Sequence, residues 1–313
     1  IYMNSARVTG LHLTIENDNI TYITNCQLGK GSFSNVLNLI SHKDRCIKIY
    51  KAKDKYTETA YTEKNIIMKL NNLEFIVNLF DYFFYENHYC LILSKYTCNL
   101  YDLYKKKYIS NRKVKFIAYN ILNGLALLKK HKIIHRDLKP ENILIRCCED
   151  TINRCVITDF NSSIDLLEQH IDYSNTNIVS TYYRAPEIFV EELPDYSYPI
   201  DMWSFGLILY EIITRHTLFK LKLSSDFKKD NKVLFDLHFN FLGCSNLLLS
   251  QYPTQKYNFQ INPMLFKSGL QTLFTETIKW DPRSRFTPED ALNYLSDNNF
   301  LIQNNSDIRE HAL

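Results

Sequence analysis

The stretch of sequence that decides the fold runs from Ile134 to Leu144 and reads IHRDLKPENIL. Four of its residues carry full charges, and apolar residues stand at both ends. Placing so many charged groups between apolar strands costs free energy unless each group is paired or used. A purely structural role therefore does not explain this loop, and we expect Asp137, Lys139 and Asn142 within it to perform chemistry.

A second acidic segment follows 22 residues after Asp137, where residues 158–161 read TDFN. Its carboxylate, Asp159, and the amide oxygen of Asn142 are hard oxygen ligands of the kind that Mg²⁺ prefers, with phosphate and water completing the coordination. We predict that these two residues hold the metal. The eight cysteines form no CxxC pair with zinc spacing, so we expect reduced thiols rather than a zinc site.

A glycine-rich segment, residues 28–36 (LGKGSFSNV), lies upstream between two predicted strands. Its glycines would let backbone amides approach a polyphosphate, although an ordinary glycine hairpin explains the segment equally well. Lys48 then stands in an apolar strand, and Glu63 stands on the next predicted helix. A lone strand lysine is commonly a solvated edge charge, but a lysine paired with Glu63 could grip phosphate groups.

The spacing of apolar residues predicts an α+β fold with strands first and helices afterwards. Short β-branched runs broken by turn residues predict three strands between Thr21 and Tyr50. Two further strands are predicted at Ile76–Phe83 and His88–Leu93, and a helix between them at Thr57–Leu70. After Asn99 the period is helical, and we expect helices over Val114–Leu128, over Ile200–Thr214 with burial on every side, and from Thr287 onward.

Three more motifs complete an ordered series: YRAPE at 183–187, DMWSFG at 201–206 and WDPRSR at 280–285. Together with the segments above, they resemble the signature motifs of eukaryotic protein kinases, in the same order and at compatible spacing. The resemblance covers essentially all of residues 20–300. It implies a bilobal fold, in which a small antiparallel sheet lobe with one main helix joins a larger, mostly helical lobe. It also implies ATP and Mg²⁺ as cofactors and proteins as substrates.

The same resemblance implies a division of the chain. We expect an N-terminal extension (1–20), an N-lobe (21–93), a hinge (94–99), a C-lobe (100–302) with an insert near 217–266, and a polar tail (303–313).

Each motif residue takes a role from the resemblance. Asp137 would accept or orient the proton of the attacking hydroxyl, and Lys139 would neutralise charge that develops on the γ-phosphoryl group. Lys48, held by Glu63, would position the α- and β-phosphates. Leu93 would be the gatekeeper before the hinge, and Asn99 would approach the ribose. The nucleotide site as a whole would comprise Leu28, Gly29, Gly31, Val36, Cys46, Lys48, Leu93, Tyr96, Asn99 and Leu144.

Other motif residues resemble structural or regulatory positions of the family. Glu187 and Arg285 would form a buried ion pair, and Asp201 would anchor the backbone of the catalytic loop. Arg136 could bind a phosphate on the activation segment, where Tyr173, Ser174 and Thr176 are the candidates for modification.

Two residues indicate which class of hydroxyl group would accept the phosphoryl group. Lys139 within HRDLKPEN is typical of serine/threonine kinases, and Ser180 lies where these enzymes place a hydroxyl that bridges to the catalytic aspartate and lysine. The segments HYCLIL (88–93), NLYDL (99–103), SS (162–163), YYRAPE (182–187) and FLG (241–243) resemble the dual-specificity tyrosine-regulated and homeodomain-interacting kinases of the CMGC group.

The sequence departs from that pattern at three positions. Asn161 replaces the glycine of the DFG motif, and asparagine tolerates left-handed backbone angles, so we expect the loop to form. Asn177 stands where such kinases carry an autophosphorylated tyrosine, which argues against that form of regulation. Thr181 replaces an arginine associated with preference for proline after the phosphoacceptor, so we do not expect proline-directed specificity.

Two other readings compete with an active protein kinase. A pseudokinase would bind nucleotide or partners with little catalysis, but such proteins usually lack the lysine or one of the aspartates that are present here. A small-molecule phosphotransferase of related fold would lack the Ala185-Pro186-Glu187 segment.

Composition excludes some other classes. The formal charge of +3 and a pI near 8.3 are too mild to indicate a nucleic-acid partner. The longest strongly apolar run, Phe205–Ile213, is too short to cross a bilayer, and no signal-peptide pattern is present. We expect a soluble, monomeric, intracellular protein of the nucleus or cytoplasm, with no membrane association.

Overall fold

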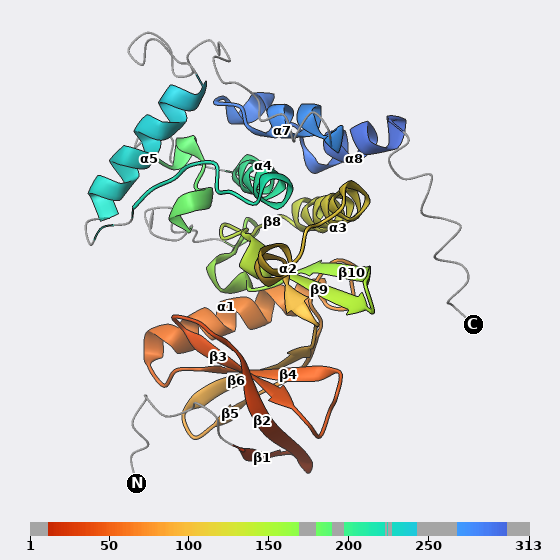
Figure 1. Ribbon diagram of the computed structural model, residues 1–313. Helices are drawn as coiled ribbons and strands as arrows, with labels where there is room; N and C mark the ends of the chain where they lie inside the picture. Colours follow the sequence, from red (N-terminus) through yellow and green to blue (C-terminus); the bar gives the residue numbers. More distant parts are fainter. Residues whose placement is uncertain are drawn as a thin grey trace.

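The computed structural model describes residues 12–168, 180–189, 197–222, 224, 227–242 and 268–298. Figure 1 shows two parts: a β-sheet with one long helix, built from the first third of the chain, and a mostly helical part. Short strands and 3-10 turns lie where the two parts meet. This is the bilobal α+β fold predicted from the sequence.

The N-terminal sheet has six antiparallel strands in the order β1-β2-β3-β4-β6-β5. The strands are β1 (Thr14–Asn17), β2 (Ile20–Lys30), β3 (Ser34–Leu39), β4 (Arg45–Tyr50), β5 (Leu79–Tyr85) and β6 (His88–Ser94). Helix α1 (Asp54–Leu70) connects β4 to β5 and packs its apolar side, including Ala60, Ile67 and Leu70, into the core.

Strand β4 lies at the centre of this packing because its side chains alternate between two apolar clusters. Ile47 and Ile49 point into the outer cluster, while Cys46 and Tyr50 belong to the large cluster that continues into the helical part. Strand β1 was not predicted. It falls in the expected extension 1–20, yet it pairs with β2 and buries Ile15 completely in the outer cluster.

The three strands expected between Thr21 and Tyr50 are β2, β3 and β4, and the helix and the strand expected next are also present. The start of β5 was placed three residues too early, at Ile76. Ile76 instead bridges Ile157, and the N–H of Val77 donates to the carbonyl of Ile157 at 3.0 Å. These two apolar residues therefore join the sheet lobe to the helical part rather than extending the sheet.

Among the described residues, the helical part contains the three predicted helices, α3 (Asn111–Lys130), α4 (Pro199–Thr214) and α8 (Pro288–Asp297). It also contains three that were not predicted individually, α2 (Leu100–Lys106), α5 (Phe227–Leu242) and α7 (Gln271–Thr277). Helix α4 is buried along almost its whole length, as its continuous apolar sequence predicted. Helix α8 begins with the expected cap, because the Thr287 side chain and Asp290 bond reciprocally in a capping box. None of the described helices is long and apolar enough to cross a membrane.

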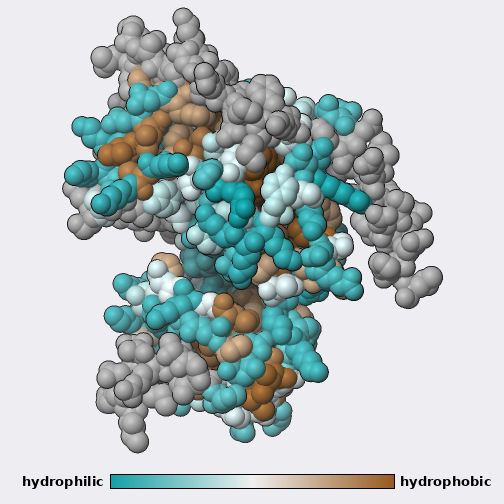
Figure 2. Space-filling view, in the orientation of Figure 1, coloured by the Kyte–Doolittle hydropathy of each residue, from teal (hydrophilic) through white to brown (hydrophobic). Residues whose placement is uncertain are grey.

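Short elements at the junction carry the charged loop. Strands β7 (Cys98–Asn99), β9 (Ile143–Cys148) and β10 (Thr151–Ile157) form one small sheet, and β8 (Ile133–Ile134) pairs with β11 (Ile164–Asp165) in another. The 3-10 turns η1 (Pro140–Asn142) and η2 (Phe160–Ser162) lie among these strands. The turns η3 (Thr181–Tyr183), η4 (Pro186–Phe189) and η5 (Pro282–Ser284) instead contact α4 or α5 of the helical part. The loop after β8 and the TDFN segment after β10 consequently lie together, and Figure 2 shows this face hollowed between the two parts.

Candidate active site

One buried carboxylate of α4 anchors the backbone of the charged loop, residues 134–144. Asp201 accepts hydrogen bonds from the backbone N–H groups of His135 (2.8 Å) and Arg136 (3.0 Å). Arg136 has φ 64°, a left-handed angle that an ordinary residue adopts only when its surroundings hold it there. The sequence predicted this anchor, and the contact is present.

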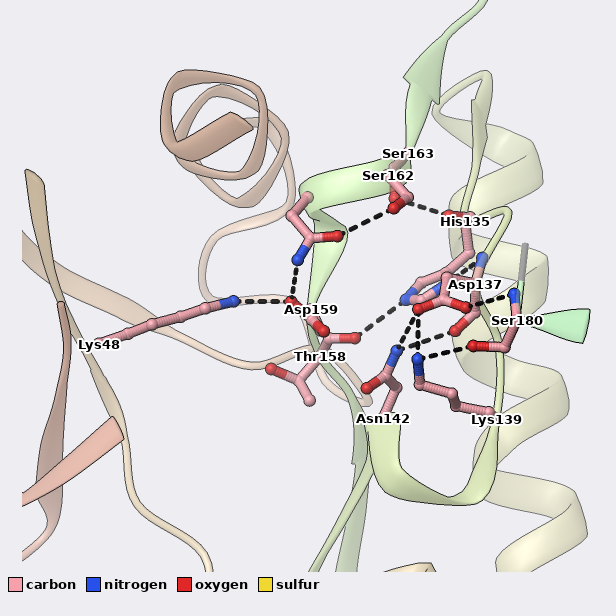
Figure 3. Close-up of polar contacts among 11 residues, drawn as sticks. Lys48, His135, Asp137, Lys139, Asn142, Thr158, Asp159, Ser162, Ser163 and Ser180 are labelled. Atoms are coloured by element: carbon pink, nitrogen blue, oxygen red, sulfur yellow. Dashed lines mark hydrogen bonds and ion pairs between the residues drawn. The ribbon is translucent and has the colours of Figure 1, made fainter. Parts of the chain in front are cut away.

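The carboxylate of Asp137 accepts from two side chains, Lys139 and Asn142, and from one backbone N–H, that of Ser180. The ammonium of Lys139 donates to Asp137 Oδ2 at 2.6 Å and to Ser180 Oγ at 2.8 Å. The N–H of Ser180 donates to the other oxygen, Oδ1, at 3.0 Å. Figure 3 shows Asp137, Lys139, Asn142 and Ser180 together on one side of the site, with Lys48 reaching in from the other. Ser180 therefore contacts both residues as expected, but its hydroxyl contacts only Lys139, and its backbone N–H makes the contact to Asp137.

Asn142 and Asp159 have oxygens suited to a hard cation. The Asn142 amide nitrogen donates to the carbonyl of Asp137 at 2.8 Å, which leaves its oxygen available. Asp159 adopts a left-handed backbone with φ 67° and uses Oδ1 for its hydrogen bonds, so Oδ2 is available. Two protein oxygens completed by phosphate and water are a typical Mg²⁺ environment, and no cluster of three His, Cys, Asp or Glu side chains occurs among the described residues.

Lys48 is the central cation of the site and is not the solvated edge charge considered above. Its ammonium lies 2.6 Å from Glu63 Oε2 on α1 and 2.6 Å from Asp159 Oδ1, and only 6% of the residue is exposed. Burial alone would lower the pKa of Lys48, but the carboxylates of Asp159 and Glu63 raise it well above its usual value. Burial likewise opposes ionisation of Asp159, and Lys48 nevertheless holds the pKa of that carboxyl below its usual range.

The predicted nucleotide residues come from strands of the N-terminal sheet, from the segment that follows β6, and from β9 at the junction. Leu28, Gly29, Gly31 and Val36 belong to the β2–β3 hairpin, while Cys46 pairs in register with Leu93 of β6. Tyr96 and Asn99 follow β6, and Leu144 on β9 is paired with Asn99. Asn99 also caps α2, since its side chain accepts a hydrogen bond from Asp102 N–H at 2.8 Å.

The glycines of the β2–β3 hairpin are not required by the fold itself. A methyl group at Gly29 would approach Val36 Cβ no closer than 3.9 Å, and one at Gly31 would meet Ser34 O at 3.4 Å. Neither residue needs a left-handed backbone. Their lack of side chains leaves this backbone open to close approach by a ligand.

Asn161 differs from the expectation in its backbone. The loop was expected to form because asparagine tolerates left-handed angles, but that tolerance is not used: Asp159 is the left-handed residue and Asn161 lies in the 3-10 turn η2. Its side chain has a role instead: Nδ2 donates to Asp159 Oδ1 at 2.8 Å, and Oδ1 accepts from Ser162 Oγ at 3.0 Å.

The region around Arg136 gives a partial view of the activation segment. The guanidinium of Arg136 donates to the carbonyl of Ser162 at 2.6 Å, and 7% of the residue is exposed. The positions considered for modification or autophosphorylation lie outside the described residues: Tyr173, Ser174, Thr176 and Asn177.

The motifs near the end of the series form a structural network. Arg285 makes two parallel bonds to the carboxylate of Glu187, at 2.6 and 2.7 Å, and both side chains are buried. The same guanidinium lies 4.9 Å from the centre of the Trp203 ring. This bidentate pair, predicted from the sequence, holds residues 98 positions apart.

Two residues of the site were missed by sequence reasoning. The ring of His135 lies 2.9 Å from the carbonyl of Thr158 and accepts from the N–H of Asp137 at 3.2 Å, so it joins the charged loop to the TDFN segment. Tyr50 contacts Glu63 through its hydroxyl. The sequence could have indicated Tyr50, because it stands two residues after Lys48 and so lies on the same face of the strand.

Comparison with known proteins agrees with this geometry. The family described as "Protein kinase domain" matches residues 22–295. Among curated proteins, dual specificity protein kinase YAK1 of Saccharomyces cerevisiae is 37% identical over 59% of the chain, and dual specificity tyrosine-phosphorylation-regulated kinase 3 of Homo sapiens is 33% identical over 67%. Serine/threonine-protein kinase prp4 of Schizosaccharomyces pombe is 28% identical over 87% of the chain. The matched segments span 23%, 37% and 66% of these three relatives.

Proposed function

Because the chain belongs to the protein kinase family, we propose that it transfers the γ-phosphoryl group of ATP to serine and threonine hydroxyls of intracellular protein substrates. The observation that carries this proposal is the assembled state of two charge clusters: Lys48 with Glu63 and Asp159, and Asp137 with Lys139 and Ser180. A family member without catalysis would not need both clusters intact, since each confines charges in a partly buried site at a cost in free energy.

In the proposed mechanism the residues act mainly by positioning and by stabilising charge. Asp137 orients the attacking hydroxyl and accepts its proton, and its contacts with Lys139 and Ser180 hold the carboxylate in place. Lys139 lies beside it to offset the negative charge of the transferring group. Lys48 holds the α- and β-phosphates. Mg²⁺ bound by Asn142 and Asp159 would neutralise charge on the phosphates.

The choice of serine and threonine as acceptors rests on Lys139 and Ser180. Their hydrogen bond of 2.8 Å places a cation and a hydroxyl beside Asp137, the arrangement typical of serine/threonine kinases in the resemblance above. Dual specificity, which appears in the names of two relatives, is the finer alternative for this chain.

The test is transfer of radiolabelled phosphate from Mg²⁺-ATP to a generic basic protein and to the kinase itself, with phosphoamino-acid analysis. We expect label on serine and threonine, and Asp137→Ala should lower turnover by about 10²–10⁴-fold, the usual contribution of a general base. ATP binding should be nearly unchanged in this variant, because Asp137 faces the acceptor rather than the nucleotide.

The principal rival is a pseudokinase that binds nucleotide or partners. Clear ATP binding without transfer in the unmodified protein would favour that reading, and equal transfer by the unmodified protein and Asp137→Ala would contradict the assigned mechanism.

A further inference from the structure

Two residues to which the proposed mechanism assigns no role, Tyr50 and Asn161, stand at the ends of the Lys48 cluster. The side chains form a continuous series from Tyr50 through Glu63, Lys48 and Asp159 to Asn161. The three central residues carry the proposed phosphate and metal chemistry. The two end residues are a tyrosine on β4 and the asparagine that replaces a glycine.

Tyr50 contacts the same oxygen of Glu63 that receives Lys48. Its hydroxyl contacts Glu63 Oε2, and the residue is completely buried. Its ring is also held near Lys48, whose ammonium lies 5.3 Å from the ring centre. Burial first, and then the neighbouring Glu63 carboxylate, raise the pKa of Tyr50, so the hydroxyl remains protonated and serves as the donor.

This contact connects α1 to the sheet by a route that does not pass through Lys48. Tyr50 is fixed on β4, where its carbonyl lies 2.6 Å from His88 Nδ1 of β6. Glu63, in contrast, belongs to α1 and depends on the position of that helix. A hydrogen bond from a fixed, buried tyrosine to a carboxylate is charge-assisted and therefore among the stronger hydrogen bonds in proteins.

Asn161 acts on the opposite end of the series. Its Nδ2 donates to Asp159 Oδ1, the oxygen that also receives Lys48 at 2.6 Å. With two donors on Oδ1, the carboxylate cannot rotate freely, and Oδ2 stays available for a cation. Asn161 is held in turn by Ser162 Oγ, which donates to its amide oxygen at 3.0 Å.

We propose that Tyr50 and Asn161 are positioning residues that keep Glu63, Lys48 and Asp159 assembled before nucleotide binds. This inference rests on the proposed kinase function and adds to it a local means of holding the site. Hydrogen bonds linked in series in a buried site reinforce one another, so loss of either end should loosen the centre. In this way, hydrogen bonds among the side chains of the site, and not the ligand, hold the site in its assembled arrangement.

The experiment compares Tyr50→Phe with Tyr104→Phe. Tyr104 is also buried, and its hydroxyl donates to the buried carboxylate of Glu211 at 2.5 Å, so the control removes the same kind of bond outside the site. We expect Tyr50→Phe to raise KM for Mg²⁺-ATP about tenfold, with a smaller change in kcat, because a charge-assisted hydrogen bond is lost. Tyr104→Phe should leave KM for Mg²⁺-ATP unchanged.

Asn161 is tested with two substitutions. Asn161→Ala removes the amide and suits the observed backbone, whereas Asn161→Gly removes the amide and adds backbone freedom. Both should raise the Mg²⁺ concentration needed for half-maximal activity by roughly tenfold, since the loss of the bond to Asp159 is common to them. Higher activity in Asn161→Gly than in the unmodified protein would overturn the assignment, because it would make the asparagine an obstacle.

A readout without turnover separates this proposal from the proposed function. Amide hydrogen exchange of α1 in the nucleotide-free protein should become faster in Tyr50→Phe and remain unchanged in Tyr104→Phe. Binding of ADP, measured by calorimetry, should weaken in parallel with the exchange effect. Binding of Mg²⁺-ADP should also weaken in Asn161→Ala, and unchanged affinity there would exclude a positioning role for Asn161. These measurements decide both roles even if the unmodified protein transfers no phosphate. Unchanged exchange and unchanged ADP affinity in Tyr50→Phe would exclude a positioning role.

Discussion

Lys48 is the residue on which the two parts of the site depend. It contacts carboxylates from α1 and from the TDFN segment, and all three groups lie in a largely buried environment. Two such carboxylates without their cation would repel each other and would have lost hydration, so removing one partner of a buried ion pair costs about 3–5 kcal/mol. We therefore expect the residue to affect stability as well as the proposed binding of phosphate.

Lys48→Met should destabilise the protein most at neutral and higher pH. In the unmodified protein the pKa of Asp159 is lowered, so its contribution is present above the ordinary carboxyl pKa and is lost as pH falls. In the variant the buried carboxylates lack that cation, and protonation at low pH relieves their repulsion. We expect the difference in melting temperature between the two proteins to shrink from pH 8 to pH 5.

Thermal unfolding of both proteins across this pH range is the measurement, with KM for Mg²⁺-ATP recorded beside it. A difference in melting temperature that stays constant with pH would show that the carboxylates are not coupled to Lys48 in solution.

At the scale of elements, the close contact between α4 and α7 depends on one glycine. A Cβ at Gly206 would lie 2.5 Å from Thr277 Oγ1 and 2.8 Å from Ile278 Cδ1. Both neighbours are buried, so neither can move into solvent. The lack of a side chain at Gly206 therefore sets how closely the two helices pack.

Gly206→Ala should be destabilising even though alanine favours helices. The gain in helix propensity is about 0.8–1.0 kcal/mol, whereas overpacking a filled core costs about 1–3 kcal/mol. We expect a net loss of about 1 kcal/mol in denaturant unfolding, the difference between these two effects. Ile278→Val, which removes the crowded Cδ1, should make the double variant less unstable than the sum of the single changes. An increase in stability in Gly206→Ala alone would contradict this packing.

The elements also show what the sequence could and could not predict. The apolar pattern located α3 and α4, and the cap residues from Thr287 located the start of α8. The apolar pattern missed β1, whose four residues give too short a pattern, and it misplaced the start of β5, where Ile76 and Val77 pair across the junction. Local apolar pattern cannot tell which distant segment a residue will pair with.

The contacts of the candidate site likewise divide into those that the sequence predicted and those that it did not. The resemblance to the family implied the pairing of Lys48 with Glu63 and of Arg285 with Glu187. The contact of Lys48 with Asp159 was not predicted. The contacts of Tyr50 and Asn161 depend on side-chain directions that only the folded chain defines. Asn161 is the clearer case. Because it replaces a glycine, the sequence drew attention to its backbone angles, whereas in the structure its side chain makes the notable contact, a hydrogen bond to Asp159.

At the scale of the whole molecule, the proposed nucleotide site takes residues from both parts of the chain. Lys48 and Glu63 come from the sheet and α1, whereas Asn142 and Asp159 come from the junction with the helical part. A ligand that contacts both groups binds the folded protein and not the unfolded chain. Binding should therefore stabilise the protein as a whole and not one part alone.

Mg²⁺-ATP at 100 times its dissociation constant should increase the free energy of unfolding by about 2.7 kcal/mol. The increase should be smaller when a chelator removes Mg²⁺, because the oxygens of Asn142 and Asp159 then face the phosphates without a cation between them. Asp159→Asn should lose the dependence on Mg²⁺ while retaining part of the response to ATP, since Asn carries no negative charge to attract the metal. Thermal shifts at fixed ATP with and without Mg²⁺ measure this directly. Equal shifts in both conditions for the unmodified protein would mean that the metal is not held at this site.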